Sequence, residues 1–148
     1  MKRFIDVHAG EIMAAAQDTV LRSNTNNACL VYVAYDKIKR IGALAHSMFL
    51  SGSLGEKWSS HILCDAERAI DEMIGDMKLL GSNVNDISIQ LVSGENVPGV
   101  EHNSDYDANL RSAVDLIKKK HLNVNVSSAK DVGQAHVALD VATGEVYY

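Results

Sequence analysis

Apolar residues recur at two spacings along the chain, and each spacing predicts one kind of element. Between residues 60 and 80 they recur every three or four positions and form one apolar stripe, which is typical of a helix packed on a core. Gly81 is placed to end this helix. Residues 105–120 show the same spacing, with Ser104 available as a cap and three lysines in the last turn. The pattern therefore predicts two main helices.

Other segments alternate in polarity or are rich in β-branched and aromatic residues, as strands are. They are residues 29–35, 40–49, 87–91, 122–126, 136–141 and 145–148. Thr143-Gly144 predicts a hairpin turn between the last two. Strands come first, and then a helix, a strand, a helix and more strands. We therefore expect an α/β fold, a layered sandwich in which two main helices pack on a mixed sheet.

Length and composition fit one globular domain that spans residues 1–148. The chain has 148 residues, of which 47% are apolar and 22% are charged, and it shows no repeat, linker or low-complexity tract. A domain of this size buries enough surface to fold without disulfides or a structural metal.

Charge and hydropathy exclude several classes of function. The net charge of −5 disfavours binding to DNA or RNA phosphates. No run of 18 apolar residues is present, so we expect no insertion into a membrane. The N-terminus lacks the pattern of a secretory signal, so we expect a cytoplasmic protein whose cysteines, Cys29 and Cys64, are reduced.

Cys29 and His46 form the first candidate for chemistry. Cys29 stands where a polar loop becomes a hydrophobic strand, and His46 lies near the end of the next strand. A hairpin centred between Lys37 and Ile38 would pair the two residues directly, with Cβ atoms about 5 Å apart. A thiol is weakly ionised at neutral pH, and a neighbouring imidazole can take its proton and activate it as a nucleophile.

The polar loop before Cys29 supplies two further groups. Ser23, at the other end of this loop, is a candidate to hold the imidazole in one tautomer. Backbone N–H groups at Asn27 and Ala28 could stabilise an oxyanion on an attacked carbonyl. The residues alone also allow a second interpretation, in which Cys29 is a small buried apolar residue and His46 a hydrogen-bonded core histidine.

His61 and Cys64 are three residues apart on the first predicted helix, a spacing that can hold a metal. A zinc site needs three or four ligands, and the sequence offers no second pair. We therefore expect neither a metal nor a cofactor.

The same residues resemble the CheD family of chemoreceptor glutamine deamidases. The family has a Gly-Glu near its N-terminus, a loop that ends in Ser-Cys, a hydrophobic strand and a Gly-Ala-x-x-His. The chain carries Gly10-Glu11, Cys29 and Gly42-Ala43-Leu44-Ala45-His46, with the family's separation of 17 residues between cysteine and histidine. Residues 89–94 and 141–146 are similar to later parts of the family pattern. In the loop, asparagines stand where the family has glycines, and asparagine tolerates the left-handed conformation better than most residues.

The resemblance implies a fold, a reaction and partners. The fold would be the family's layered α/β sandwich. The Cys29 thiolate would attack a receptor glutamine side chain, His46 would move the protons, and Ser23 would occupy the position of the family's catalytic threonine. A thioester would then be hydrolysed to leave glutamate. The expected partners are chemoreceptor cytoplasmic helices and a CheC-type phosphatase.

Two rival functions remain open at this point. One is a non-catalytic CheD paralogue that binds a chemotaxis partner. The other is a different thiol hydrolase on the same scaffold, acting on a small amide or as a toxin-like deamidase. The glutamine deamidase and the different thiol hydrolase both need a reactive Cys29, whereas the non-catalytic paralogue does not.

Overall fold

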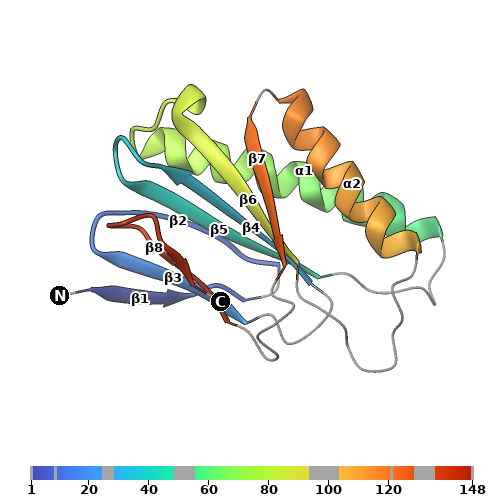
Figure 1. Cartoon of the computed structure of the whole chain (residues 1–148), viewed down its shortest axis with the longest axis horizontal. Coiled ribbons are helices and arrows are strands. Elements are labelled where there is room, and N and C mark those ends of the chain that lie inside the picture. The colour runs from blue at the N-terminus through green and yellow to red at the C-terminus, as the bar shows by residue number, and fades with distance from the viewer. Residues whose placement is uncertain are drawn as a thin grey trace.

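Two β-sheets are stacked face to face, and two helices cover the outside of one of them (Figure 1). The computed structural model describes residues 2–8, 10–24, 29–48, 56–93, 104–120, 122–128 and 136–147. Within these ranges the elements are β1 (Arg3–Asp6), β2 (Ile12–Ala16), β3 (Thr19–Asn24), β4 (Cys29–Asp36), β5 (Ile41–Met48), α1 (Glu56–Leu79), the 3-10 helix η1 (Val84–Asp86), β6 (Ile87–Ser93), α2 (Ser104–Lys119), β7 (Asn123–Ser128), β8 (His136–Asp140) and β9 (Val146–Tyr147).

The larger sheet has five strands in the order β2-β5-β4-β6-β7. Only β6 and β7 pair in parallel and the other neighbours are antiparallel, so this sheet is mixed. Its central strand β4 is buried on both faces: Tyr32 and Ala34 face the helices, while Val31 and Val33 face the second sheet. A strand covered on both sides reads as a continuous apolar run, which explains why residues 29–35 are so hydrophobic.

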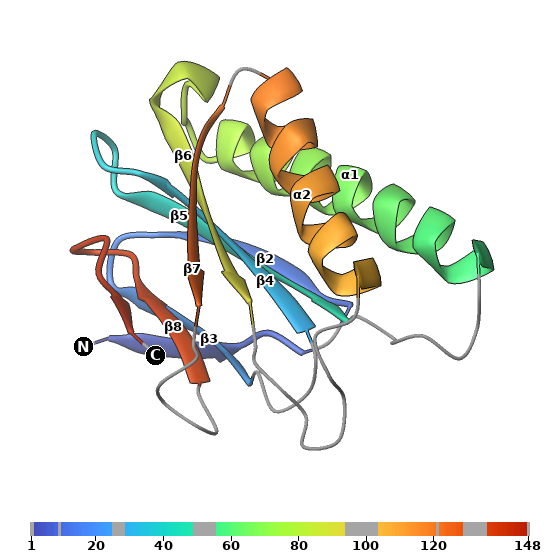
Figure 2. The same cartoon turned by 45° about the vertical axis from the view of Figure 1, so that its right-hand side comes forward.

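The helices pack on one face of this sheet through the stripes that the spacing predicts. Ile70, Met73 and Met77 of α1 and Ala113 and Ile117 of α2 are buried in the same cluster as the helix-facing residues of β4, β5 and β6. After a turn of 45°, α1 and α2 still lie together on one side of the five-stranded sheet, with the four-stranded sheet on the other (Figure 2).

The smaller sheet has four strands in the order β1-β3-β8-β9. Its inner face contributes Leu21, Val137 and Leu139 to a second core, which they share with Val31 and Leu44 of the five-stranded sheet. The expected α/β sandwich with two main helices is therefore confirmed, but the strands divide into two sheets instead of one.

Three strands near the N-terminus were not predicted from the sequence. β1 has four residues, and β2 contains three consecutive alanines, which favour strands weakly. The stretch 23–27 was predicted to be a loop, but Ser23 and Asn24 are the last two residues of β3. Short strands without strong alternation give little local signal. Here β1 pairs with β3, β2 with β5 and β3 with β8, and this pairing stabilises them as strands.

The helix boundaries also differ slightly from the prediction. α1 begins at Glu56, four residues before the predicted start, and ends at Leu79. Gly81 follows in the left-handed conformation, at φ 115°. Its N–H donates to the Lys78 carbonyl and that of Ser82 to the Met77 carbonyl, which is the Schellman arrangement that closes a helix.

Candidate active site

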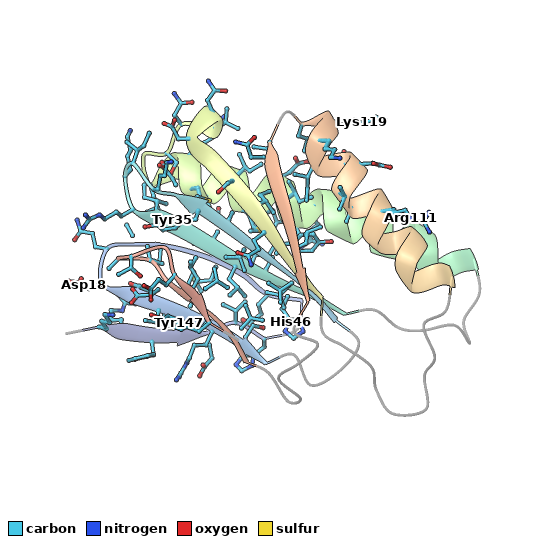
Figure 3. The ribbon with its side chains drawn as sticks, viewed as in Figure 1. Asp18, Tyr35, His46, Arg111, Lys119 and Tyr147 are labelled. Carbon is cyan, nitrogen blue, oxygen red and sulfur yellow. The ribbon has the colours of Figure 1, made fainter. Side chains whose placement is uncertain are left out.

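His46 lies near the end of β5 and faces the space between the two sheets. His46 shares a face of β5 with Leu44, which belongs to the core between the two sheets. Only 9% of the residue is exposed. Figure 3 shows His46 at one end of the five-stranded sheet, away from Tyr35 at the other end. The packing of the sheets therefore places a nearly buried imidazole at one edge of the inner core.

Ser23 reaches His46 from the opposite sheet. It follows Leu21 by two residues on β3, so its side chain also points into the space between the sheets. Its Oγ lies 2.7 Å from Nδ1 of His46, and the residue is 3% exposed. The contact joins residues 23 positions apart and depends on the stacking of the two sheets.

The carbonyl of Val7 determines the direction of this hydrogen bond. Ser23 Oγ also lies 2.9 Å from the Val7 carbonyl oxygen, which can only accept. The single hydroxyl proton of Ser23 is therefore donated to Val7, and Oγ accepts a proton from Nδ1–H of His46. In this tautomer Nε2 carries the lone pair, so Nε2 is the nitrogen that can act as a base.

The segment after β1 holds the backbone of His46. The Gly10 N–H donates to the His46 carbonyl at 2.7 Å, and the His46 N–H donates to the Glu11 carbonyl at 3.2 Å. Gly10 has φ 81°, in the region that favours glycine. Oε1 of Glu11 accepts the N–H of His8 at 2.9 Å and so stabilises the same turn. The Gly-Glu pair thus has a structural role beside the imidazole.

The surroundings of His46 favour its neutral form. Burial lowers the pKa of His46 below its ordinary value of 6.5, because the charged imidazolium loses hydration there. The nearby imidazole of His8 lowers the pKa of His46 further by like-charge repulsion. Near neutral pH His46 is therefore an uncharged base.

The observed register corrects the predicted pairing of Cys29 with His46. His46 lies opposite Val31, and Cys29 lies opposite Met48. The Asp36 carboxylate accepts the N–H groups of Ile38 and Lys39, and this makes a four-residue turn centred one residue later than predicted.

The shift in register leaves Cys29 close to His46 along the sheet. Val31 pairs with His46, and Cys29 lies two residues before Val31 on β4. Cys29 is the diagonal neighbour of His46, and such positions are about 7 Å apart.

The remaining predicted site residues are less well defined. Asn27 and Ala28 lie outside the described residues. His61 and Cys64 lie on α1, in a part whose side chains are not described. Within the described part of the chain, no three histidine, cysteine, aspartate or glutamate residues cluster as a metal site would require. No described helix is long and apolar enough to span a membrane.

Two groups at this site could not be predicted from the sequence. One is the Val7 carbonyl, which leaves no trace in sequence because every residue carries a carbonyl. The other is His8, three residues before Glu11. Only a prediction of the turn that joins these two residues would have placed His8 near His46.

Solved structures support the fold alone. The hypothetical protein YfiH of Bacillus licheniformis aligns with a TM-score of 0.50 and 14% identity over 78% of this chain. Protein NMB0706 of Neisseria meningitidis, of family DUF152, aligns with a TM-score of 0.52 and 10% identity over 86% of this chain. The alignments span 49% and 63% of those two chains.

Curated relatives match almost the whole chain, although no protein-family model does. The probable chemoreceptor glutamine deamidase CheD of Chlorobium luteolum is 28% identical over 143 residues, which are 97% of this chain and 71% of that protein. The chemoreceptor glutamine deamidase CheD of Halalkalibacterium halodurans is 22% identical over 134 residues, which are 90% of this chain and 83% of that protein. These two matches confirm the resemblance to the CheD family noted from the motifs, and the chain is similar to CheD proteins over almost its whole length.

Proposed function

We propose that this chain is a cysteine-dependent protein glutamine deamidase that converts glutamine side chains of chemoreceptors to glutamate. The observation that carries the proposal is the buried contact of 2.7 Å between Ser23 Oγ and His46 Nδ1. It leaves Nε2 as a base in a chain that is similar to a probable chemoreceptor glutamine deamidase and to a chemoreceptor glutamine deamidase. Cys29 is the proposed nucleophile, and its backbone position on β4, diagonal to His46, supports this role.

The first half of the reaction forms a thioester. Nε2 of His46 takes the proton of the Cys29 thiol, and the thiolate attacks the carboxamide carbon of the substrate glutamine. Backbone N–H groups at Asn27 and Ala28 stabilise the oxyanion that forms. The C–N bond then breaks as the His46 imidazolium gives its proton to the departing nitrogen, and ammonia leaves.

The second half restores the enzyme. Nε2 of His46 removes a proton from water, and the resulting hydroxide adds to the thioester carbon. The C–S bond breaks, the Cys29 thiolate leaves, and the product is glutamate. Throughout, Ser23 keeps Nδ1 protonated and the ring in place, while the lowered pKa of His46 keeps it ready to accept a proton.

The proposed substrates are the cytoplasmic helices of chemoreceptors, and the proposed partner is a CheC-type phosphatase. Both are inferred from the similarity to CheD proteins. The reaction accordingly takes place in the cytoplasm, and it requires no metal or cofactor because thiol, imidazole and water supply every proton and bond.

The first test measures the reactivity of Cys29. The protein is labelled with iodoacetamide across a pH series, and the modified cysteine is identified by peptide mapping. We expect Cys29 to label with an apparent pKa well below that of a free thiol, about 8.5. His46→Ala should remove this shift, and Cys64→Ser should leave it unchanged. Labelling of Cys29 that ignores His46 would contradict the proposed nucleophile.

The second test measures turnover on purified chemoreceptor cytoplasmic fragments. Mass spectrometry of receptor peptides locates glutamines converted to glutamate, and Cys29→Ala serves as the inactive control. A protein with a reactive Cys29 that leaves receptor glutamines unchanged but hydrolyses small amides would be a different thiol hydrolase. An unreactive Cys29 together with stable binding to a CheC-type protein would favour the non-catalytic paralogue.

A further inference from the structure

The end of the molecule opposite His46 exposes three large apolar side chains. They are Ile38, in the turn between β4 and β5, and Leu79 and Leu80, at the end of α1, with 65%, 86% and 47% of each residue exposed. Nζ of Lys39 donates to the Gly81 carbonyl at 2.5 Å, so this turn and the end of α1 lie side by side. We call these three residues, with the cations around them, the apolar tip.

Neither local structure needs these apolar side chains. The turn is closed by the Asp36 carboxylate, which binds the N–H groups of Ile38 and Lys39. In the Schellman arrangement that ends α1, the usual apolar contact would involve the positions of Met77 and Ser82. Turns favour polar residues, and an exposed leucine adds nothing to a helix end. The exposure of Ile38 and Leu79 is therefore not explained by the fold.

Four cations surround these apolar residues. Lys37, Lys39 and Arg40 occupy the turn and Lys78 lies beside Leu79. None of the four forms an ion pair with another described residue. This local concentration of positive charge stands out in a chain of net charge −5.

The acids of this end are fewer. Asp76 lies one helical turn before Leu80. Asp18 follows Gln17, and the N–H of Gln17 donates to the Arg40 carbonyl. Asp36 is fully buried and binds its own turn. Asp86, the last residue of η1, is half-buried and directly precedes Ile87, which pairs with Asp36. The four cations outnumber Asp18, Asp76 and Asp86, so the tip carries a small excess of positive charge around its apolar residues.

We propose that the apolar tip is a docking surface for an acidic amphipathic helix of a protein partner. Charge complementarity with Lys37, Lys39, Arg40 and Lys78 selects acidic flanks, and the three apolar side chains select a helix with an apolar face. The tip consists of a turn and a helix end, so it offers no strand edge for a partner to extend.

The tip is separate from the candidate active site. His46 lies five residues beyond Ile41 along β5, which at about 3.3 Å a residue is about 17 Å. Figure 3 places Tyr35, one residue before Asp36, and His46 at opposite ends of the sheet. A partner bound at the tip would leave Ser23 and His46 uncovered, so this inference does not depend on the proposed reaction.

The test uses the whole protein, labelled with ¹⁵N, and three synthetic helical peptides of equal length. The first carries leucines on one face and glutamates on its flanks. The second has the same composition in scrambled order, and the third has lysines in place of the glutamates. We expect only the first peptide to perturb the amide resonances of residues 37–40 and 78–81.

Variants then identify the groups responsible. Ile38→Ser and Leu79→Ser should each weaken binding of the first peptide about tenfold. Lys78→Glu should weaken it more at low salt than at high salt, because salt screens the exposed charge. The matched controls are Phe4→Ser, which removes another exposed apolar side chain, and Lys119→Glu on α2, and both should bind as the parent protein does.

Several results would overturn the proposal. They are the absence of perturbation, perturbation centred elsewhere, an equal response to the scrambled or lysine peptide, and unchanged binding by the Ile38 and Leu79 variants. Vesicles of anionic phospholipid are titrated in parallel. If the vesicles perturb residues 37–40 and 78–81 and the acidic peptide does not, the tip is a membrane-binding surface instead.

Discussion

The hydrogen bond at Nδ1 of His46 sets the tautomer of its imidazole. The Val7 carbonyl takes the only proton of Ser23, and Ser23 in turn accepts the proton on Nδ1. A backbone group thus determines which nitrogen of a side chain on another sheet is basic. The hydroxyl matters here as an acceptor, a role that the hydroxyl of threonine could also fill.

Replacement of Ser23 tests this role directly. Ser23→Ala removes the acceptor for Nδ1–H, so we expect kcat/KM on receptor fragments to fall about 100-fold. Ser23→Thr keeps the hydroxyl and should retain most of the activity. The ¹⁵N chemical shifts of the His46 ring report the tautomer independently of activity. A Ser23→Ala protein that keeps Nδ1 fully protonated would contradict the assigned role.

The neighbouring His8 provides a prediction about pH. The charge of His8 lowers the pKa of His46, so His8→Gln should move the pKa of His46 upward, toward 6.5. The acid limb of the kcat/KM profile should move to higher pH by the same amount. Proton NMR titration of the His46 ring measures the shift. Lys119→Gln, which removes a distant positive charge on α2, should not produce it.

Among the elements, the turn between β4 and β5 sets the position of Cys29 relative to His46. Asp36 is fully buried, and one carboxylate oxygen accepts two backbone N–H groups of the turn. Its position makes the loop four residues long, so that Asp36 pairs with Ile41 and Cys29 with Met48. A single carboxylate therefore fixes the register along the whole hairpin.

Asp36→Ala leaves both turn N–H groups without their acceptor. We expect the free energy of unfolding to fall by about 1–3 kcal/mol. Asp36→Asn keeps an acceptor oxygen and should cost less. Urea denaturation gives the difference, and a smaller loss for the alanine variant than for the asparagine variant would show that the turn does not depend on this oxygen.

Local patterns predicted some of these elements well and others poorly. The stripes of Ile70, Met73 and Met77, and of Ala113 and Ile117, produced correct helices because one face of each is buried. The pairing of Cys29 failed by two positions because it depends on one side-chain hydrogen bond. The contact of Ser23 with His46 needs two sheets to stack, and no local pattern reports how separate sheets pack.

In the whole molecule, the two sheets lie too close together at Gly42 to admit a side chain there. A Cβ there would lie 2.6 Å from Cδ2 of Leu139 and 3.3 Å from Cγ2 of Val141. Gly42 belongs to β5, the strand that carries His46, and Leu139 belongs to β8, which pairs with the strand of Ser23. The distance between the sheets, and with it the contact at the candidate site, depends on the absence of a side chain at Gly42.

Gly42→Ala should force the sheets apart locally. We expect the free energy of unfolding to drop by about 1–3 kcal/mol from overpacking, and kcat/KM to fall although the site residues are unchanged. Gly75→Ala is the matched control, since a Cβ at this position on α1 meets nothing within 4 Å. It should raise the free energy of unfolding by about 1 kcal/mol. Calorimetry compares both with the parent protein.

The division of Ser23 and His46 between two layers has a consequence for how activity fails. Loosening of one layer from the other would separate the pair while each sheet still keeps its own backbone hydrogen bonds. The imidazole would then lose its preferred tautomer in a chain that spectroscopy still counts as folded. Catalytic activity would therefore be lost when the layers separate, before any measurement of secondary structure detects a change.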